Sequence, residues 1–371
     1  MKKYFGVILS LLLIVAVGAG IYKSSQHKPG DAVSGLDIHA GQTKPKKIVR
    51  LLAGSAKFSF LKDPELEAIL AKEDIQLELI KSSSFIQDKE KLGELDAAWP
   101  AGANVAADWS SIMIGSTTYP IFSTPLAIAS WTALMPVFEK NGLAKMSGPN
   151  HGDFYLEKAL PLMLKATRWN QLKDNTVFAV NKSFLVNTPD LRKSNTGSLF
   201  IAALAYIQNN NEVPQDIEKA ATMAESLSPL ITRQGFQEST LAGPFEDYIG
   251  QGMGKAPLVL IYESQFLEAK RAGKLRDGNI ILYPKPGLVL KHVLVGKTPN
   301  GKRLGELLST NPEIQKIAAK YGFRTNDPLV FAAMTKTIGL DAPEQLNLAE
   351  TPSTNVLDAI NQTIIKKLEG N

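Results

Sequence analysis

The sequence predicts an α/β protein body preceded by an apolar N-terminal helix. Short apolar segments alternate with helical ones along most of the 371 residues, which is the order of βαβ units around a parallel sheet. With 44% hydrophobic and 21% charged residues, the chain is long enough for one large or two medium cores. The N-terminus begins with an uncharged, strongly apolar run that is long enough to cross a membrane, and we expect nothing in the body to span one.

The N-terminus has the features of an export signal. Two lysines, Lys2 and Lys3, precede residues 4–21, an uncharged run of 18 residues that spans roughly 27 Å as a helix. Leading positive charges keep the N-terminus in the cytoplasm and send the rest outward. Weak small-x-small sites at 16–18 and 18–20 leave a cleaved signal peptide open, but the length favours a retained anchor over residues 1–22. Residues 23–47, rich in Gly, Ser, Lys and Pro, read as a flexible linker.

Composition excludes several kinds of site. The absence of cysteine removes disulfides, thiolate metal sites, Cys nucleophiles and a lipid-modified Cys after the signal. The four histidines form no ligand-spaced pair, so we expect neither a metal nor a cofactor. The net charge of +5 is spread along the chain rather than gathered on an aromatic-rich arm, which disfavours nucleic-acid binding. Mild attraction of anions remains compatible with it.

The body is expected to contain the following elements. The strands lie at 48–53, 75–80, 95–99, 122–130, 177–181, 258–262, 279–283 and 288–295, and the helices at 64–73, 134–141, 156–164, 199–207, 216–227, 244–250, 265–272, 301–308 and 312–321.

Two turns are candidate ligand sites. Gly54-Ser55 follows the first strand, where the amides and hydroxyls of an open α/β sheet reach ligands, although a plain turn explains it as well. Ser194-Asn195-Thr196-Gly197-Ser198 opens an apolar helix, so free amides and hydroxyls there favour an anion or a carbonyl oxygen. A simple N-cap is the alternative.

Other residues and motifs give weaker evidence of a functional site. Glu263 follows a buried strand and either faces a cleft or caps the next helix, and Trp99 either lines a ligand wall or packs in the core. GxxxxGK[ST] and GxSxG are absent, and no carboxylate pair has catalytic spacing. We therefore expect no enzymatic activity.

Several segments together resemble the type 2 periplasmic solute-binding proteins, in particular the substrate-binding-domain group distantly related to the sulfate- and molybdate-binding proteins. The resemblance spans roughly residues 47–326. It is carried by LLAGS at 51–55 with the downstream PELEAI, LDAAWP at 95–100, SNTGS at 194–198, GKAPL at 254–258 leading to Tyr262 and Glu263, and the ending PEIQKIAAKYGFRT at 312–325.

The resemblance implies two α/β lobes that close on a ligand about a hinge near 123–126 and 286–290. Lobe one would comprise 48–125 and 288–371, and lobe two 126–287. Ser83 is an imperfect match, because Ser82, Ser83 and Ser84 stand where relatives often have Gly-Ser. The ligand-binding residues so predicted are Gly54, Ser55, Ser83, Trp99, Pro100, Ser194, Asn195, Thr196, Gly197, Ser198, Tyr262 and Glu263.

Two functions remain open at this stage. The first is an extracytoplasmic, non-catalytic binding protein that captures a small polar, preferentially anionic, ligand for an ABC-type permease in the membrane. The second is a membrane-anchored sensory or scaffold protein that uses the same fold to engage a protein partner. The long apolar N-terminus without a lipoprotein cysteine supports the second more than it would for a freely diffusing carrier.

Overall fold

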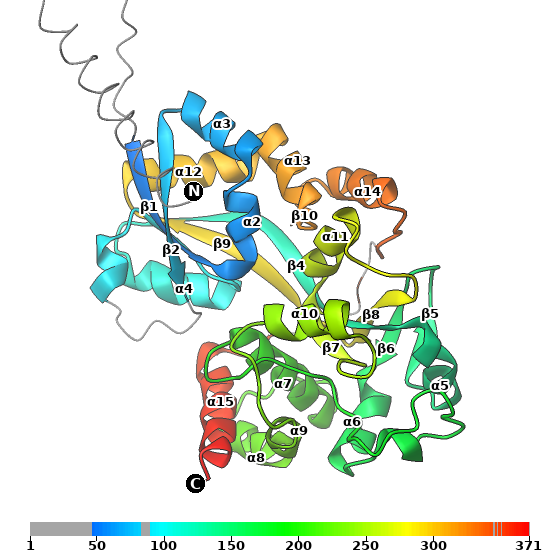
Figure 1. Cartoon of the computed structure of the whole chain (residues 1–371). Helices are drawn as coiled ribbons and strands as arrows, with labels where there is room; N and C mark the ends of the chain where they lie inside the picture. The colour runs from blue at the N-terminus through cyan, green and yellow to red at the C-terminus, as the bar shows by residue number, and fades with distance from the viewer. Residues whose placement is uncertain (1–46, 83–89, 344–345, 347, 350, 371) are drawn as a thin grey trace, which may run out of the picture. The chain divides into compact units, whose positions relative to one another are not determined.

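We describe the protein from a computed structural model (Figure 1). The chain divides into two units, Met1–Lys44 and Pro45–Asn371. The predicted N-terminal helix, and the predicted linker apart from Lys47, lie outside the described residues. Within the described part of the chain, no helix is long and apolar enough to cross a membrane. The structure describes residues 47–82, 90–343, 346, 348–349 and 351–370.

The chain enters the fold through a βαβ unit, as the sequence predicts. Strand β1 (Lys47–Gly54) pairs in parallel with β2 (Ile75–Ser82) on one side and with β3 (Ala97–Trp99) on the other. Helix α3 (Pro64–Lys72) connects the first two strands. It begins where the Asp63 carboxylate accepts hydrogen bonds from the amides of Glu65 and Leu66, which satisfies donors that the first turn leaves free.

One long strand runs through both halves of the sheet. Strand β4 (Thr117–Trp131) pairs with β9 (Val289–Gly296) over its first half. Over its second half it pairs with β7 (Val259–Tyr262) and β8 (Asn279–Lys285). Pro125, which predicted an edge or crossing position, is the last residue of β4 that pairs with β9. The predicted hinge segments therefore lie where the chain crosses between the two halves.

We call the half built on β1, β2, β3, β9 and residues 117–125 lobe one. Its core is aromatic: the Phe122 and Phe323 rings stack with centroids 3.9 Å apart, and Phe60 and Trp99 pack around them. The helices of this lobe, beyond α3, are α2 (Phe58–Leu61), α4 (Ala103–Ile112), α12 (Pro299–Thr310) and α13 (Pro312–Lys320).

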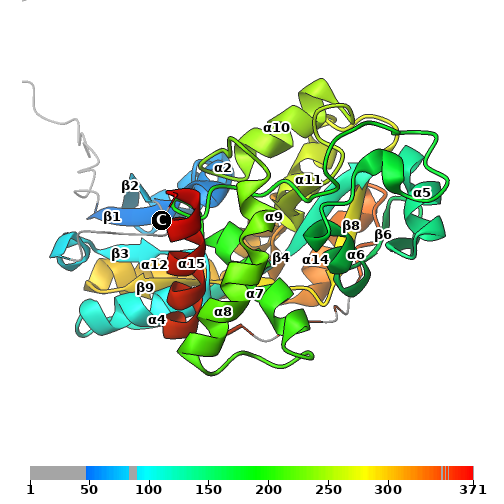
Figure 2. The ribbon, with the colours of Figure 1, turned by 90° about the horizontal axis from the view of Figure 1, so that it is seen from below.

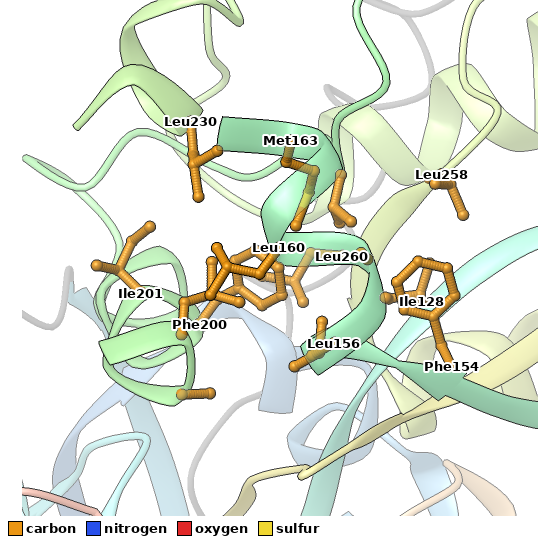
Figure 3. Packing of buried hydrophobic residues seen from close by; sticks show 14 of the residues in the cluster. Ile128, Phe154, Leu156, Leu160, Met163, Phe200, Ile201, Leu230, Leu258 and Leu260 are labelled. Atoms are coloured by element: carbon orange, nitrogen blue, oxygen red, sulfur yellow. The ribbon is translucent and has the colours of Figure 1, made fainter. Parts of the chain in front are cut away.

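We call the half built on residues 126–131 of β4 with β5 (Ala144–Met146), β6 (His151–Tyr155), β7 and β8 lobe two. Leu156, Leu160 and Met163 recur along one face of α6 (Leu156–Leu164) and meet Phe200 and Ile201 of α7 (Asn195–Gln208), as Figure 3 shows. Each such fully buried side chain contributes about 1.5–3 kcal/mol. The remaining helices are α5 (Met135–Lys140), α8 (Ile217–Leu227), α9 (Pro229–Thr232), α10 (Ala242–Gln251) and α11 (Glu263–Arg271).

The C-terminal segment packs on lobe two. Helix α15 (Thr354–Leu368) lies against α7, α8 and α9, and its apolar residues Val356, Leu357, Ile360 and Ile364 belong to the lobe-two core (Figure 2). The buried ring of Phe331, on α14 (Pro328–Thr337), also joins a lobe-two cluster. The boundary expected from the resemblance, with 288–371 in lobe one, therefore differs from the packing after β10 (Arg324–Thr325). The sequence did not predict this, because the apolar face of a helix can be buried equally well against either lobe.

The prediction of a strand at 177–181 is wrong, because the structure has a loop there. The Asn175 side chain donates to the carbonyls of Trp169 and Phe178 and accepts from the Phe178 amide, so the segment curls around it as a loop. Phe178 turns inward against Trp169, while Val177 and Val180 stay exposed. The short apolar run has the composition of a strand, but the asparagine supplies a competing local hydrogen-bond pattern.

The turn at the end of α13 joins three parts of the fold. Tyr321 donates to the Asp63 carboxylate at 2.9 Å. Gly322 has φ +78°, and a Cβ there would lie 2.7 Å from the Ser264 carbonyl oxygen on α11. Phe323 stacks in the core of lobe one, and Arg324 reaches the Glu263 carboxylate of α11. The YGFR sequence is thus a connection between lobe one and α11.

Candidate functional site

A pocket of about 670 Å³ lies between the lobes. Two other pockets, of about 510 and about 560 Å³, are each lined by one lobe. Most residues that line the interlobe pocket have polar side chains, and they come from strand ends, helix starts and loops. It comprises Gly54, Ser55, Ala56, Lys57, Ser59, Lys81 and Ala101 from lobe one, and Lys193, Ser194, Thr196, Ser239, Thr240, Leu241, Ala242, Tyr262, Gln265 and Glu268 from lobe two.

The wall from lobe one is the end of β1 and the short helical turns that follow it. The 3₁₀ helix Ser55–Lys57 runs directly into α2 (Phe58–Leu61). Ser55 is exposed to the pocket, whereas the side chain of Lys57 turns inward and is fully buried. Gly54 has an extended backbone (φ −69°, ψ 147°) that any residue adopts, so its importance here is the open space that it leaves where a Cβ would stand, next to the Lys57 amine.

The amine of Lys57 lies beneath that open space. A Cβ on Gly54 would stand 3.5 Å from Lys57 Nζ. The amine is 3.4 Å from His292 Nδ1 and 3.5 Å from the Pro100 carbonyl oxygen, and it sits 5.5 Å from the centroid of the Trp99 ring. Burial lowers the pKa of Lys57 from 10.5 to about 7. No carboxylate of the described residues forms a salt bridge with it.

The wall from lobe two is the start of α7. Asp190 shapes the preceding loop: its carbonyl accepts from the Ser194 amide and its carboxylate accepts from the amide and side chain of Arg192. Ser194 precedes the first helical residue, and its side chain makes no capping hydrogen bond. The first turn of α7 therefore faces the pocket without a hydroxyl cap, which leaves amide donors and the positive end of the helix dipole there.

Two hydroxyls of lobe two form a pair at this wall. Thr196 Oγ1 and Tyr262 Oη are 2.6 Å apart. Burial raises the pKa of Tyr262 to about 12, although the hydrogen bond with Thr196 opposes the shift. The tyrosine is consequently neutral near pH 7, and the pair keeps hydrogen-bonding capacity toward the pocket.

The charges of the lining are predominantly positive. Lys57, Lys81 and Lys193 are opposed in the lining by the single carboxylate of Glu268. Lys81 and Lys193 are exposed and hydrated, so they attract anions at longer range, whereas Lys57 acts from a desolvated position.

The structure brings five of the predicted residues together in this pocket and places five others elsewhere. Ser83 and the side chain of Asn195 lie outside the described part. The five in the pocket are Gly54, Ser55, Ser194, Thr196 and Tyr262, and the five elsewhere are Trp99, Pro100, Gly197, Ser198 and Glu263.

Glu263 does not line the pocket and instead makes buried contacts within the fold. Its carboxylate is fully buried, accepts two hydrogen bonds of 2.7 Å from the Arg324 guanidinium, and accepts a third of 2.6 Å from the Tyr283 hydroxyl. Burial and the neighbouring carboxylate raise the pKa of Tyr283 well above its ordinary value. Tyr262 is the last residue of β7 and lines the pocket, whereas Glu263 begins α11 and its carboxylate lies against Arg324 and Tyr283.

The other four residues support the pocket from behind. Trp99 is fully buried against Phe60 and Phe122, and with the Pro100 carbonyl it surrounds the Lys57 amine. A Cβ on Gly197 would lie 2.9 Å from the Pro189 carbonyl oxygen, so this glycine lets the loop pack closely on α7. Ser198 is buried, and its hydroxyl has no partner among the described residues.

The sequence did not reveal Lys57, Lys193 or the loop 239–242 as parts of the pocket. Lys57 stands two residues after the Gly54-Ser55 turn, and that proximity was the one available signal. Its burial depends on His292 and Pro100, which are far away in the chain. No group of three or more His, Asp or Glu residues in the described part could hold a metal ion.

Comparisons with known proteins agree with this architecture. No protein-family model and no curated protein sequence matches the chain. Solved structures that match include a solute-binding protein of an ABC transporter from Thermotoga lettingae bound with α-D-tagatose (11% identity, TM-score 0.55, 88% of this chain and 95% of that chain). A periplasmic thiamin-binding protein matches at 11% identity and TM-score 0.54, over 91% of this chain and 99% of that one.

A third match is IdiA (FutA) of Trichodesmium in complex with iron and citrate (12% identity, TM-score 0.51, 87% of this chain and 99% of that chain). The ligands named for these proteins differ, while the arrangement of strands and helices is shared over nearly the whole length. At such low identity the likeness concerns the fold alone. The chain has the two-lobed fold of the type 2 periplasmic solute-binding proteins.

Proposed function

We propose that this protein is a non-catalytic solute-binding protein that captures a small polar, preferentially anionic, ligand in the interlobe pocket. The observation that carries the proposal is the lining: Ser55 of lobe one and Ser194, Thr196 and Tyr262 of lobe two present hydroxyls to one space of about 670 Å³. Pockets of roughly 300–1,000 Å³ suit small molecules. A ligand that contacts both walls would favour the closed arrangement of the lobes.

We expect the lobes to close by rotation about the two segments of chain that pass from one lobe to the other. Residues 123–126 of β4 and 286–290, which lead into β9, lie where the chain passes from one lobe to the other. Small changes of backbone angle there would turn one lobe against the other without disturbing either core. The closed, liganded form is then the one that a membrane permease of the ABC class would recognise.

We expect a ligand to raise the melting temperature of the protein. In a thermal-shift screen of inorganic oxyanions, carboxylates, amino acids and sugars, a ligand at 100 times its Kd should stabilise the fold by about 2.7 kcal/mol, a shift of about 4 °C. Ser55→Trp, which fills the pocket from an exposed position, should abolish the shift. The matched control Ser111→Trp, at an exposed serine of α4 outside the pocket, should retain it. Absence of any shift in the wild type would contradict the proposal.

The proposal that the protein acts outside the cytoplasmic membrane is based on its N-terminal residues. The uncharged run at 4–21 behind Lys2 and Lys3 would deliver the body across the cytoplasmic membrane and hold it there. This run also supports the second candidate, an anchored sensory or scaffold protein that engages a protein partner. The two candidates differ in what the mature protein retains.

We expect the full-length protein to remain in the membrane fraction of an expressing bacterium with its N-terminus intact. Intact-mass measurement of that fraction should give the unprocessed chain, because the small-x-small sites at 16–18 and 18–20 are weak and the apolar run is long. A soluble form shortened by about 20 residues would instead favour a freely diffusing carrier.

A further inference from the structure

One of the three lysines in the pocket is built into the protein interior. Lys81 and Lys193 are exposed, whereas Lys57 is fully buried and still borders the pocket through the open side of Gly54. A buried charge is normally paired with an opposite charge, because desolvation costs several kcal/mol. Lys57 has no such pair among the described residues.

The groups that surround Lys57 supply no negative charge. Strand β9 contributes His292, whose pKa burial, together with the nearby lysine, lowers well below its ordinary value, so it stays neutral. The strand β3 and the residue after it contribute the Trp99 ring and the Pro100 carbonyl, and β1 contributes Gly54. The remaining titratable groups line the same pocket on other elements: Lys81 of β2, Lys193 before α7, Tyr262 of β7 and Glu268 of α11.

These surroundings leave part of the amine's hydrogen-bonding capacity unused. An ammonium has three N–H donors, and the two protein acceptors lie at long distances of 3.4 and 3.5 Å. The unused direction compatible with the structure is toward Gly54, where no side chain intervenes. An anionic group in the pocket at that point would complete a charge-assisted hydrogen bond that the protein alone does not make.

We propose that Lys57 is the charge-recognising residue of the pocket: its ammonium binds one anionic group of the ligand beside Gly54, and capture of the ligand is accompanied by uptake of a proton at this amine. The inference rests on the proposed solute-binding function and assigns it a ligand class and a pH dependence. Neutral sugars do not offer the missing counter-charge, whereas carboxylates and oxyanions do.

The sign of the pH dependence follows from linkage. In the free protein the pKa of Lys57 is about 7, and an adjacent anion raises it. Above pH 7 the free protein must therefore bind a proton in order to bind the anion, and the affinity falls as the pH rises. Below pH 7 the amine is already charged, so the affinity is nearly constant.

The test uses the full-length protein with probes that stay ionised between pH 6 and 8.5: sulfate, molybdate, acetate and lactate, with glucose and tagatose as neutral probes. For an anion that binds, calorimetry in buffers of different ionisation enthalpy should find uptake of about 0.7 proton at pH 7.5. Its Kd should rise about tenfold between pH 7 and pH 8.5.

Two variants examine the residue itself. Lys57→Met should weaken anion binding at least tenfold at pH 6.5 and remove both proton uptake and the pH slope. Gly54→Ala keeps the lysine but places a methyl group against its amine, in a backbone conformation that alanine adopts, and should also weaken the anion. Lys193→Met, at an exposed lysine of the same pocket, should weaken binding less and leave the proton uptake intact.

The outcomes distinguish failure of the role of Lys57 from failure of the solute-binding function. If an anion binds the wild type and Lys57→Met equally and without proton uptake, the role of Lys57 is wrong while the solute-binding function stands. Binding of neutral probes alone would also overturn the role of Lys57. If no probe, charged or neutral, binds the wild type, and the wider screen is negative too, the proposed function fails and the inference with it.

Discussion

Lys57→Met should stabilise the ligand-free protein by about 1–4 kcal/mol at pH 6.5. The native fold holds the amine fully buried, where its pKa falls from 10.5 to about 7, whereas the unfolded chain keeps the ordinary value. At pH 6.5 both states are protonated, so the wild type bears the whole cost of burying the charge. Methionine has a similar length and no charge to bury.

The advantage of the variant should shrink as the pH rises. Between about pH 7 and pH 10.5 the unfolded wild type binds one more proton than the native state at Lys57, so the stability of the wild type increases by up to about 1.4 kcal/mol per pH unit. Urea unfolding of both proteins between pH 6 and pH 9 measures the difference. Lys193→Met provides the exposed control and should change stability by less than about 0.5 kcal/mol. A variant less stable than the wild type at pH 6.5 would contradict the burial of a charged amine.

Arg324→Met should destabilise the protein by about 3–5 kcal/mol. It removes the bidentate partner of Glu263, whose carboxylate has no solvent access, and leaves it with the Tyr283 hydroxyl. The substitution also removes the guanidinium from the Phe331 ring, 4.8 Å away, and the hydrogen bond to the Pro343 carbonyl. Urea unfolding at pH 7 gives the change in the free energy of unfolding.

A second substitution tests the cause. Glu263→Gln in the Arg324→Met background removes the uncompensated charge and should recover part of the lost stability, as a double-mutant cycle measures. The control Lys320→Met, four positions before Arg324 in the chain, breaks the exposed ion pair with Glu65 and should cost less than about 1 kcal/mol. Equal costs for the buried and exposed pairs would refute the role assigned to Glu263.

Elements with a strong local signal were predictable. The β1–α3–β2 unit has a buried apolar strand, an Asp63 cap before Pro64 and an alternating second strand, and all three appear in the structure. The strand predicted at 177–181 failed because the Asn175 hydrogen bonds override a short apolar run. The side on which α15 packs was not predictable, because an amphipathic helix specifies that it must be buried but not against what.

The sequence by itself determined the α/β class, the apolar N-terminal run and the two turns, Gly54-Ser55 and Ser194 to Ser198, that contribute to the pocket from opposite lobes. Only the tertiary structure decided which side chains of those segments face the pocket: Tyr262 does and Glu263 does not, and Lys57 acquires its unusual environment from His292 and Pro100. The physical reason is that a pKa and an empty hydrogen-bonding direction depend on burial and on neighbours distant in the chain, which local sequence patterns do not encode.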